Sequence, residues 1–233
     1  MTMRSRHVQS PHSPIGLRSE HIAEFERLLW IQPKYDPHSA DEFQIKYDSD
    51  DSTLIAVTGT KYQSGRRVRE FRDASGLPMF EAQAERSLWK KKPWRIRLPG
   101  STESDGEDLA KLKRKGLQSN FDLTFRNALA EDAKTDSERM VTLEVRSANA
   151  GFGTFGIWAA GRKVADVRQS VTRNRTVSSS LSMGATWKGA YSQPTRSIME
   201  ILVADGFDFC LPTPPSHAEI RDLEKRLNPK MVS

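Results

Sequence analysis

Hydrophobic and polar residues alternate along much of the chain from about residue 41 onward. The alternation is most regular in four segments, at residues 43–47, 94–98, 121–125 and 141–145. A period of two places one side of a segment against a core and the other side in water, which is typical of antiparallel strands. Turn signals rich in glycine, serine and proline separate the segments. Many short strands of this kind predict a mainly β fold, either a sandwich or a barrel.

Two apolar runs lack the alternation. Residues 54–57 and 198–203 are almost continuously hydrophobic, which predicts strands that are buried on both faces or lie next to a barrel interior. Two polar segments, at residues 101–107 and 174–189, are expected to be long loops because they are acidic or rich in Ser, Thr and Gly.

Helical spacing appears first near the N-terminus. Ser19 is a candidate N-cap, and Ile22, Phe25 and Leu29 follow at helical spacing. This pattern predicts a short helix over residues 19–31, whose apolar side would dock on the main domain.

The two ends of the chain differ in composition from its middle. Residues 1–18 contain three arginines and two Ser-Pro pairs but almost no apolar side chains, which predicts a disordered basic tail. Residues 216–219 (Ser-His-Ala-Glu) fit a capping box, and the charged segment after them predicts a surface helix. The expected organisation is therefore a tail at 1–18, a short helix and linker at 19–40, a β domain at 41–211, and a Pro-rich turn with a surface helix at 212–233.

Composition narrows the classes of function. The chain has 233 residues, of which 36% are hydrophobic, so it can form one sizeable core. No apolar stretch approaches the roughly 18 residues of a membrane-spanning helix, and no apolar run follows the N-terminal arginines, as it would in a secretory signal. We therefore expect a cytoplasmic location, with the membrane periphery and the nucleus as the alternatives. A single cysteine, Cys210, excludes a disulfide framework and a zinc finger.

No pattern in the sequence predicts catalysis. Residues 151–156 match the dinucleotide fingerprint G-x-G-x-x-G, but residues 157–164 continue as strand, turn and strand instead of opening a helix, which favours a glycine-rich hairpin. The five histidines show no metal-ligand spacing, and no histidine is expected near Cys210 to activate it. We therefore expect a non-enzymatic protein with no catalytic residue, metal or cofactor, and an enzyme is the third hypothesis after membrane binding and nucleic-acid binding.

The basic residues are unevenly distributed. The net charge is +6, which favours anionic partners, and residues 61–115 hold 15 Lys and Arg against 8 Asp and Glu. The densest part is residues 89–97, where three lysines in a turn lie between Trp89 and Trp94. Arg95 and Arg97 are expected on the outward face of the next strand, and Trp94, Ile96 and Leu98 on its inward face. Such a cationic, tryptophan-flanked turn suits an anionic membrane surface or the phosphates of nucleic acid. A simple solvated face is the third interpretation.

Several motifs occur in an order that resembles a known family. They include residues 54–60 (LIAVTGT), 69–80 (REFRDASGLPMF), 94–99 (WRIRLP), 120–125 (NFDLTF), 141–145 (VTLEV), 163–168 (KVADVR) and 198–208 (IMEILVADGFD). Over about residues 41–211 the series resembles the LURP-one-related proteins of the Tubby C-terminal-like superfamily, which also includes the phospholipid scramblases. The order of the motifs carries the resemblance, because no single motif is specific.

The resemblance implies a twelve-stranded antiparallel barrel around a hydrophobic helix near the C-terminus. It implies no catalysis, since the family is not known for any. Tubby domains bind phosphoinositides through basic surface residues, but their binding motif does not align with this sequence. After Asp208 this chain has Phe209-Cys210-Leu211 and then prolines in place of a long apolar helix. We therefore expect large side chains or the 19–31 helix to fill the interior, with closure of the barrel in question.

The sequence thus predicts a Tubby-like module that binds anionic, phosphoinositide-type membrane lipid, with protein partners unknown. The expected lipid-binding residues are basic and lie on one face: Arg66, Arg67, Lys90, Lys91, Lys92, Arg95 and Arg97. The alternative is a nuclear protein associated with nucleic acid or transcription that uses the same face.

Overall fold

The computed structural model describes residues 7–33, 42–58, 61–63, 66–85, 94–101, 108–115, 120–147, 154–170, 173, 198–208 and 210. Within these residues the strands are β1 (Arg27–Pro33), β2 (Phe43–Tyr47), β3 (Thr53–Val57), β4 (Lys61–Gln63), β5 (Arg66–Asp73), β6 (Pro78–Glu85), β7 (Trp94–Arg97), β8 (Ala110–Lys115), β9 (Asn120–Arg126), β10 (Met140–Ser147), β11 (Thr154–Ala159), β12 (Arg162–Gln169) and β13 (Met199–Val203). The helical elements that lie wholly within the described residues are short: the 3-10 turn η1 (Ser19–His21) and α1 (Asp136–Arg139).

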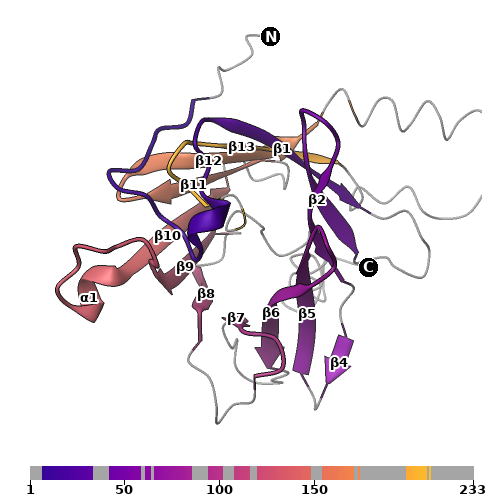
Figure 1. The fold of residues 1–233 in the computed structure, drawn as a ribbon, viewed down its shortest axis with the longest axis horizontal. Helices are drawn as coiled ribbons and strands as arrows, with labels where there is room; N and C mark the ends of the chain where they lie inside the picture. The colour runs from indigo at the N-terminus through magenta and orange to yellow at the C-terminus, as the bar shows by residue number, and fades with distance from the viewer. Residues whose placement is uncertain are drawn as a thin grey trace, which may run out of the picture.

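The strands form one antiparallel sheet that closes on itself (Figure 1). Its order is β3-β2-β1-β13-β12-β11-β10-β9-β8-β7-β6-β5-β4, and β3 also pairs with β5. The pairing of β3 with residues 71–73 of β5 joins twelve strands in a ring, whereas β4 pairs with residues 66–68 of the same strand. Strands β3 and β4 therefore share one edge of β5. The predicted antiparallel barrel is confirmed, and the question of its closure is answered by the β3–β5 pairing.

The alternating segments supply the core, as their pattern predicts. Phe121, Leu123 and Phe125 of β9 are buried and lie opposite β10, where Leu143 and Val145 are buried as well. Removing such side chains from water stabilises the fold by roughly 1.5–3 kcal/mol each. Between β5 and β6, the rings of Phe71 and Phe80 stack with their centroids 4.4 Å apart.

The helix predicted over residues 19–31 is wrong. The structure has only η1 at residues 19–21, and residues 27–33 form β1, which pairs with β13 and β2. Leu29 is fully buried in the barrel interior. Residues 27–33 are therefore a strand of the barrel and do not form a helix that fills its interior. The spacing of Ile22, Phe25 and Leu29 fits a helix, but Phe25 is 58% exposed, and strand pairing with distant residues decides the outcome.

The prediction of a disordered tail is also wrong for residues 7–18, while residues 1–6 lie outside the described part. Val8 is buried against Leu202 and Ala204, outside the main core. Ile15 is 7% exposed, belongs to the main core and forms a parallel bridge with Phe207. Residues 7–18 therefore pack on the barrel, because a few apolar side chains meet surfaces that only the folded barrel provides.

Three further predictions concern the start of the barrel, the orientation of Leu98 and the helices near the C-terminus. The barrel starts with β1, so the predicted boundary at residue 41 lies too late in the chain. Leu98, expected to point inward, is 53% exposed because β7 ends at Arg97. The surface helix after residue 216, and any helix inside the barrel after residue 210, lie outside the described residues.

Candidate functional site

A row of cations lies on the outer side of two neighbouring strands. In β8, Ala110 and Leu112 belong to or pack against the core, which places Lys111, Lys113 and Lys115 on the opposite side of the strand. All three lysines are exposed. Arg95 of β7 lies directly opposite Lys111 and has 39% of its side chain exposed. We call these four residues, Arg95, Lys111, Lys113 and Lys115, the basic face.

Asp108 organises one end of the basic face. Its carboxylate is only 7% exposed and lies 2.7 Å from Nε of Arg97, 3.5 Å from Nζ of Lys111 and 3.7 Å from Arg95. Burial by itself would raise the pKa of Asp108. The hydrogen bond from Arg97 and the charges of Arg97, Arg95 and Lys111 together outweigh burial and hold that pKa below its usual value. Asp108 is therefore a fixed anion that positions Arg95 and Lys111 beside each other.

The candidate lipid-binding residues of the sequence have different positions. Arg95 is on the basic face as expected. Arg97 also belongs to the outward row of β7, but it is 3% exposed and paired with Asp108, so the expectation that it is a surface contact is wrong. The backbones of Arg66 and Arg67 lie in β5, opposite Glu85 and Ala84. Lys90, Lys91 and Lys92 lie outside the described residues, as do the side chains of Arg66 and Arg67.

Sequence reasoning missed the three lysines of β8. The signal was present, because Lys111, Lys113 and Lys115 alternate with Leu112 in the manner of a half-buried strand. Residue 114 is an arginine, which made the segment look like an unbroken charged run and hid its period. The pairing of β8 with β7 and β9 shows that the segment is a strand and that Lys111 lies opposite Arg95.

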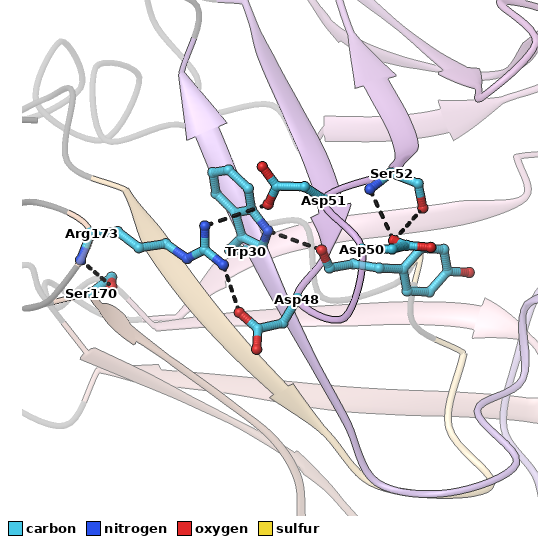
Figure 2. A network of polar contacts seen from close by, with 8 residues as sticks. Trp30, Asp48, Asp50, Asp51, Ser52, Ser170 and Arg173 are labelled. Atoms are coloured by element: carbon cyan, nitrogen blue, oxygen red, sulfur yellow. Dashed lines mark hydrogen bonds and ion pairs between the residues drawn. The ribbon is translucent and has the colours of Figure 1, made fainter. Parts of the chain in front are cut away.

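A second polar cluster surrounds Arg173 (Figure 2). Its guanidinium lies 3.9 Å from the centroid of the Trp30 ring and forms ion pairs with Asp48 at 2.7 Å and Asp51 at 3.5 Å. Asp48 and Asp51 belong to the turn between β2 and β3, and Trp30 lies on β1, where its indole N–H donates to the carbonyl of Tyr47. Arg173 therefore ties the chain after β12 to the outside of β1 and β2. This arrangement is structural, because each charge already has a partner within the cluster.

A third cluster lies where the first described residues meet the last. His21, Asp208 and Cys210 place one ligand atom each within 4.8 Å of one another. The prediction that no histidine lies near Cys210 is thus wrong, because His21 comes from the opposite end of the chain. Burial raises the pKa of Asp208 to about 6, even though backbone N–H groups donate to it. Burial, followed by the neighbouring carboxylate, raises the pKa of the Cys210 thiol, and burial lowers the pKa of His21.

The glycine-rich segment is not a dinucleotide loop. Residues 148–153 lie outside the described part, but they connect β10 and β11, which pair antiparallel. The last glycine of the motif, Gly156, lies within β11 instead of opening a helix. A pyrophosphate site of that class needs a helix N-terminus at this position, so the interpretation as a hairpin connection holds.

Comparison with known proteins identifies a family for this chain. The family model of the LURP-one-related proteins matches residues 27–208. A solved structure of a protein from Arabidopsis thaliana is similar over 91% of this chain and 96% of its own, with 15% sequence identity and a TM-score of 0.47. No curated protein sequence matches the chain. Among the described residues, no helix is both long and apolar enough to cross a membrane.

Proposed function

Because this chain belongs to the LURP-one-related family, we propose that its barrel is a non-enzymatic binding module that associates peripherally with anionic, phosphoinositide-type membrane lipid. The observation that supports the proposal is the basic face, in which Arg95, Lys111, Lys113 and Lys115 lie together on two adjacent strands. Of the candidate residues that the sequence singled out, the proposal keeps Arg66, Arg67, Lys90, Lys91, Lys92 and Arg95, and it replaces the buried Arg97 with the lysines of β8.

The spacing of the lysines suits an extended anionic surface. Alternate residues of a strand are about 7 Å apart, which is shorter than the Debye length of about 8 Å at physiological ionic strength, so the potentials of neighbouring lysines add. Asp108 offsets part of this charge beside Arg95 and Lys111, and Asp122 lies 3.2 Å from Nζ of Lys115. Glu144 also interacts with Lys115, but its ion pair is with Arg146. The four cations of the basic face therefore outnumber the two carboxylates that form ion pairs with them, and the three lysines are exposed.

Vesicle co-sedimentation tests the proposal. Full-length protein is mixed with vesicles of phosphatidylcholine, with and without a few per cent phosphatidylinositol bisphosphate, and the bound fraction is measured. Reversing the charges of Lys111, Lys113 and Lys115 to glutamate should weaken binding roughly a hundredfold, since each basic residue near an anionic surface contributes about 1 kcal/mol. The fold should survive, because all three lysines are exposed.

The matched control compares two single variants of equal net charge. Lys113→Glu changes the basic face, whereas Lys134→Glu changes an exposed lysine in the loop next to α1, which lies well away from β7 and β8 (Figure 1). Weaker binding by Lys113→Glu alone supports the basic face as the contact. Equal effects of the two variants would indicate attraction by net charge and would contradict the proposed site.

The same proteins distinguish lipid from nucleic acid. A duplex-DNA titration at several salt concentrations should show little binding by the wild type at physiological salt. Tight binding with a steep salt dependence, made shallower by the loss of the lysines of β8, would replace the lipid proposal with the nucleic-acid alternative.

A further inference from the structure

We propose that His21, Asp208 and Cys210 form a binding site for a divalent transition-metal ion, with zinc the best match. The nitrogen, oxygen and sulfur atoms that these side chains offer all lie within 4.8 Å of one another. The site is independent of the basic face and of lipid binding, because it belongs to the segments that precede β1 and follow β13.

The backbone holds these segments together before any ion binds. Ile15 bridges Phe207 in parallel, and Ile22 bridges Asp208 in antiparallel orientation. The N–H of Asp208 donates to the carbonyl of Ile15, and the N–H of Ala23 donates to the carbonyl of Phe207. The segment with Asp208 and Cys210 therefore lies between two parts of the N-terminal segment, and η1 between those parts carries His21.

Close packing fixes the position of the carboxylate. A Cβ atom on Gly16 would lie 2.7 Å from Cδ1 of Ile22 and 3.0 Å from Cβ of Asp208, so only glycine fits without displacement. One oxygen of Asp208 accepts the N–H of Leu17 at 3.0 Å, and the other accepts the N–H of Cys210 at 2.8 Å. A carboxylate has about four acceptor positions, and the N–H of Arg18 and the thiol of Cys210 also donate to Asp208. The thiol loses its proton when it binds a metal ion, so the lone pair that accepts the thiol becomes available to that ion. The backbone N–H groups act as the outer hydrogen bonds that orient a ligating carboxylate.

The donor set determines the kind of ion. Imidazole, carboxylate and thiolate together are ligands that zinc accepts, whereas calcium and magnesium prefer oxygen alone. Ligand distances of 2.0–2.3 Å in a tetrahedral site separate the donor atoms by about 3.3–3.8 Å. The limit of 4.8 Å exceeds that separation by at most about 1.5 Å, so ion binding requires the donor atoms to approach one another by that amount or less. Asp208 is fully buried, Cys210 is 5% exposed and His21 is partly exposed, which leaves room on the histidine side for water as the fourth ligand.

Metal binding would join the two ends of the described chain. His21 precedes the first strand of the barrel, and Asp208 and Cys210 follow its last strand. An ion that binds only the folded state raises the melting temperature, by an amount that grows with its concentration relative to the dissociation constant. The ion would thus stabilise the contact between the N-terminal segment and the barrel.

Direct metal titration tests the proposal. Untagged full-length protein is treated with a chelator, dialysed and titrated with Zn²⁺ in a calorimeter, and separately with Co²⁺ in a spectrophotometer. We expect one equivalent of zinc to bind, the melting temperature to rise, and Co²⁺ to produce a thiolate-to-cobalt charge-transfer band. The cobalt band reports coordination by Cys210 in the unaltered protein, so the test does not depend on any variant folding.

Variants then identify the ligands. Cys210→Ser should remove the charge-transfer band, and His21→Gln should weaken zinc binding at least tenfold, with both variants first checked for wild-type circular dichroism in chelator. His12→Asn is the matched control, because His12 is an exposed imidazole of the same N-terminal segment outside the cluster. Absence of zinc binding by the wild type would overturn the proposal, leaving the three groups as a buried hydrogen-bonded cluster. So would unchanged binding by folded His21→Gln and Cys210→Ser variants.

Discussion

Replacing Asp108 with asparagine should destabilise the barrel by about 3 kcal/mol. The side chains of Arg97 and Asp108 are 4% and 7% exposed, so the substitution leaves a buried guanidinium without its anion. Breaking a buried ion pair from one side costs about 3–5 kcal/mol. We expect the lower end of that range, because an amide oxygen can still accept the hydrogen bond from Nε of Arg97. Nη1 of Arg97 already lacks a hydrogen-bond partner among the described residues, so the site has no spare acceptor to compensate.

The assay is urea unfolding followed by tryptophan fluorescence, with the melting temperature as a second measure. A loss of 3 kcal/mol corresponds to a fall of roughly 6–12 °C for a domain of this size. Asp122→Asn is the control, because Asp122 pairs with Lys115, whose side chain is 63% exposed, and such a surface pair contributes less than about 1 kcal/mol. Both variants raise the net charge by one, so general charge effects cancel. Equal stability of the two variants would refute the conclusion that burial gives the Arg97–Asp108 pair its importance.

Three other perturbations have definite expected outcomes. The pKa of Asp108 is lower in the folded protein than its usual 3.8, so the ionised carboxylate stabilises the fold above about pH 4, and this stabilisation is lost as the pH falls through the folded pKa. Urea midpoints measured between pH 4 and pH 2 should therefore fall less steeply in Asp108→Asn than in the wild type. Parallel curves for the two proteins would contradict this expectation. Ile15→Ala should cost about 2–4 kcal/mol in urea unfolding, since Ile15 is 7% exposed in the main core, whereas a disordered tail would give no change. Arg173→Ala should lower the free energy of unfolding by about 1 kcal/mol and change the tryptophan fluorescence, because it removes the cation–π contact with Trp30 and the ion pairs with Asp48 and Asp51. An unaltered spectrum and stability would show that the cluster does not form in solution.

The candidate sites differ in how far the sequence could reveal them. The excess of basic residues between residues 61 and 115 is visible in composition, but composition cannot tell an exposed cation from a buried one. Arg95 and Arg97 are two residues apart in the same outward row, and only one of them is exposed. Both arginines pair with Asp108, but only Arg97 makes the close contact of 2.7 Å, and its partner comes 11 residues later in the chain.

No pattern in the sequence indicated that His21, Asp208 and Cys210 would come together. Ligand spacing is informative when ligands come from one local element, such as a helix turn or a short loop. His21 and Cys210 lie at opposite ends of the barrel sequence, and the bridges of Ile15 with Phe207 and Ile22 with Asp208 bring them together.

By itself, the sequence determined that most of this chain forms antiparallel strands with one apolar side. That information is local, because a period of two fixes which side chains share a face whatever the partner strand is. It also determined the turns, such as Asp73–Gly76, where the carboxylate of Asp73 accepts the N–H groups of Ser75 and Leu77 and Gly76 has a φ of +87°. The order of these local features was sufficient to show the family resemblance.

Tertiary structure alone decided which strands meet. Closure depends on the pairing of β3 with β5, and the identity of β1 as a strand depends on hydrogen bonds from β2 and β13. Residues 19–31 carry a pattern that fits a helix as well as a strand, so the partners available in space made the choice. The burial of Arg97 and the meeting of His21 with Cys210 have the same origin. Each is a contact between segments far apart in the chain, so it can stabilise the protein only after the closed barrel has brought those segments together.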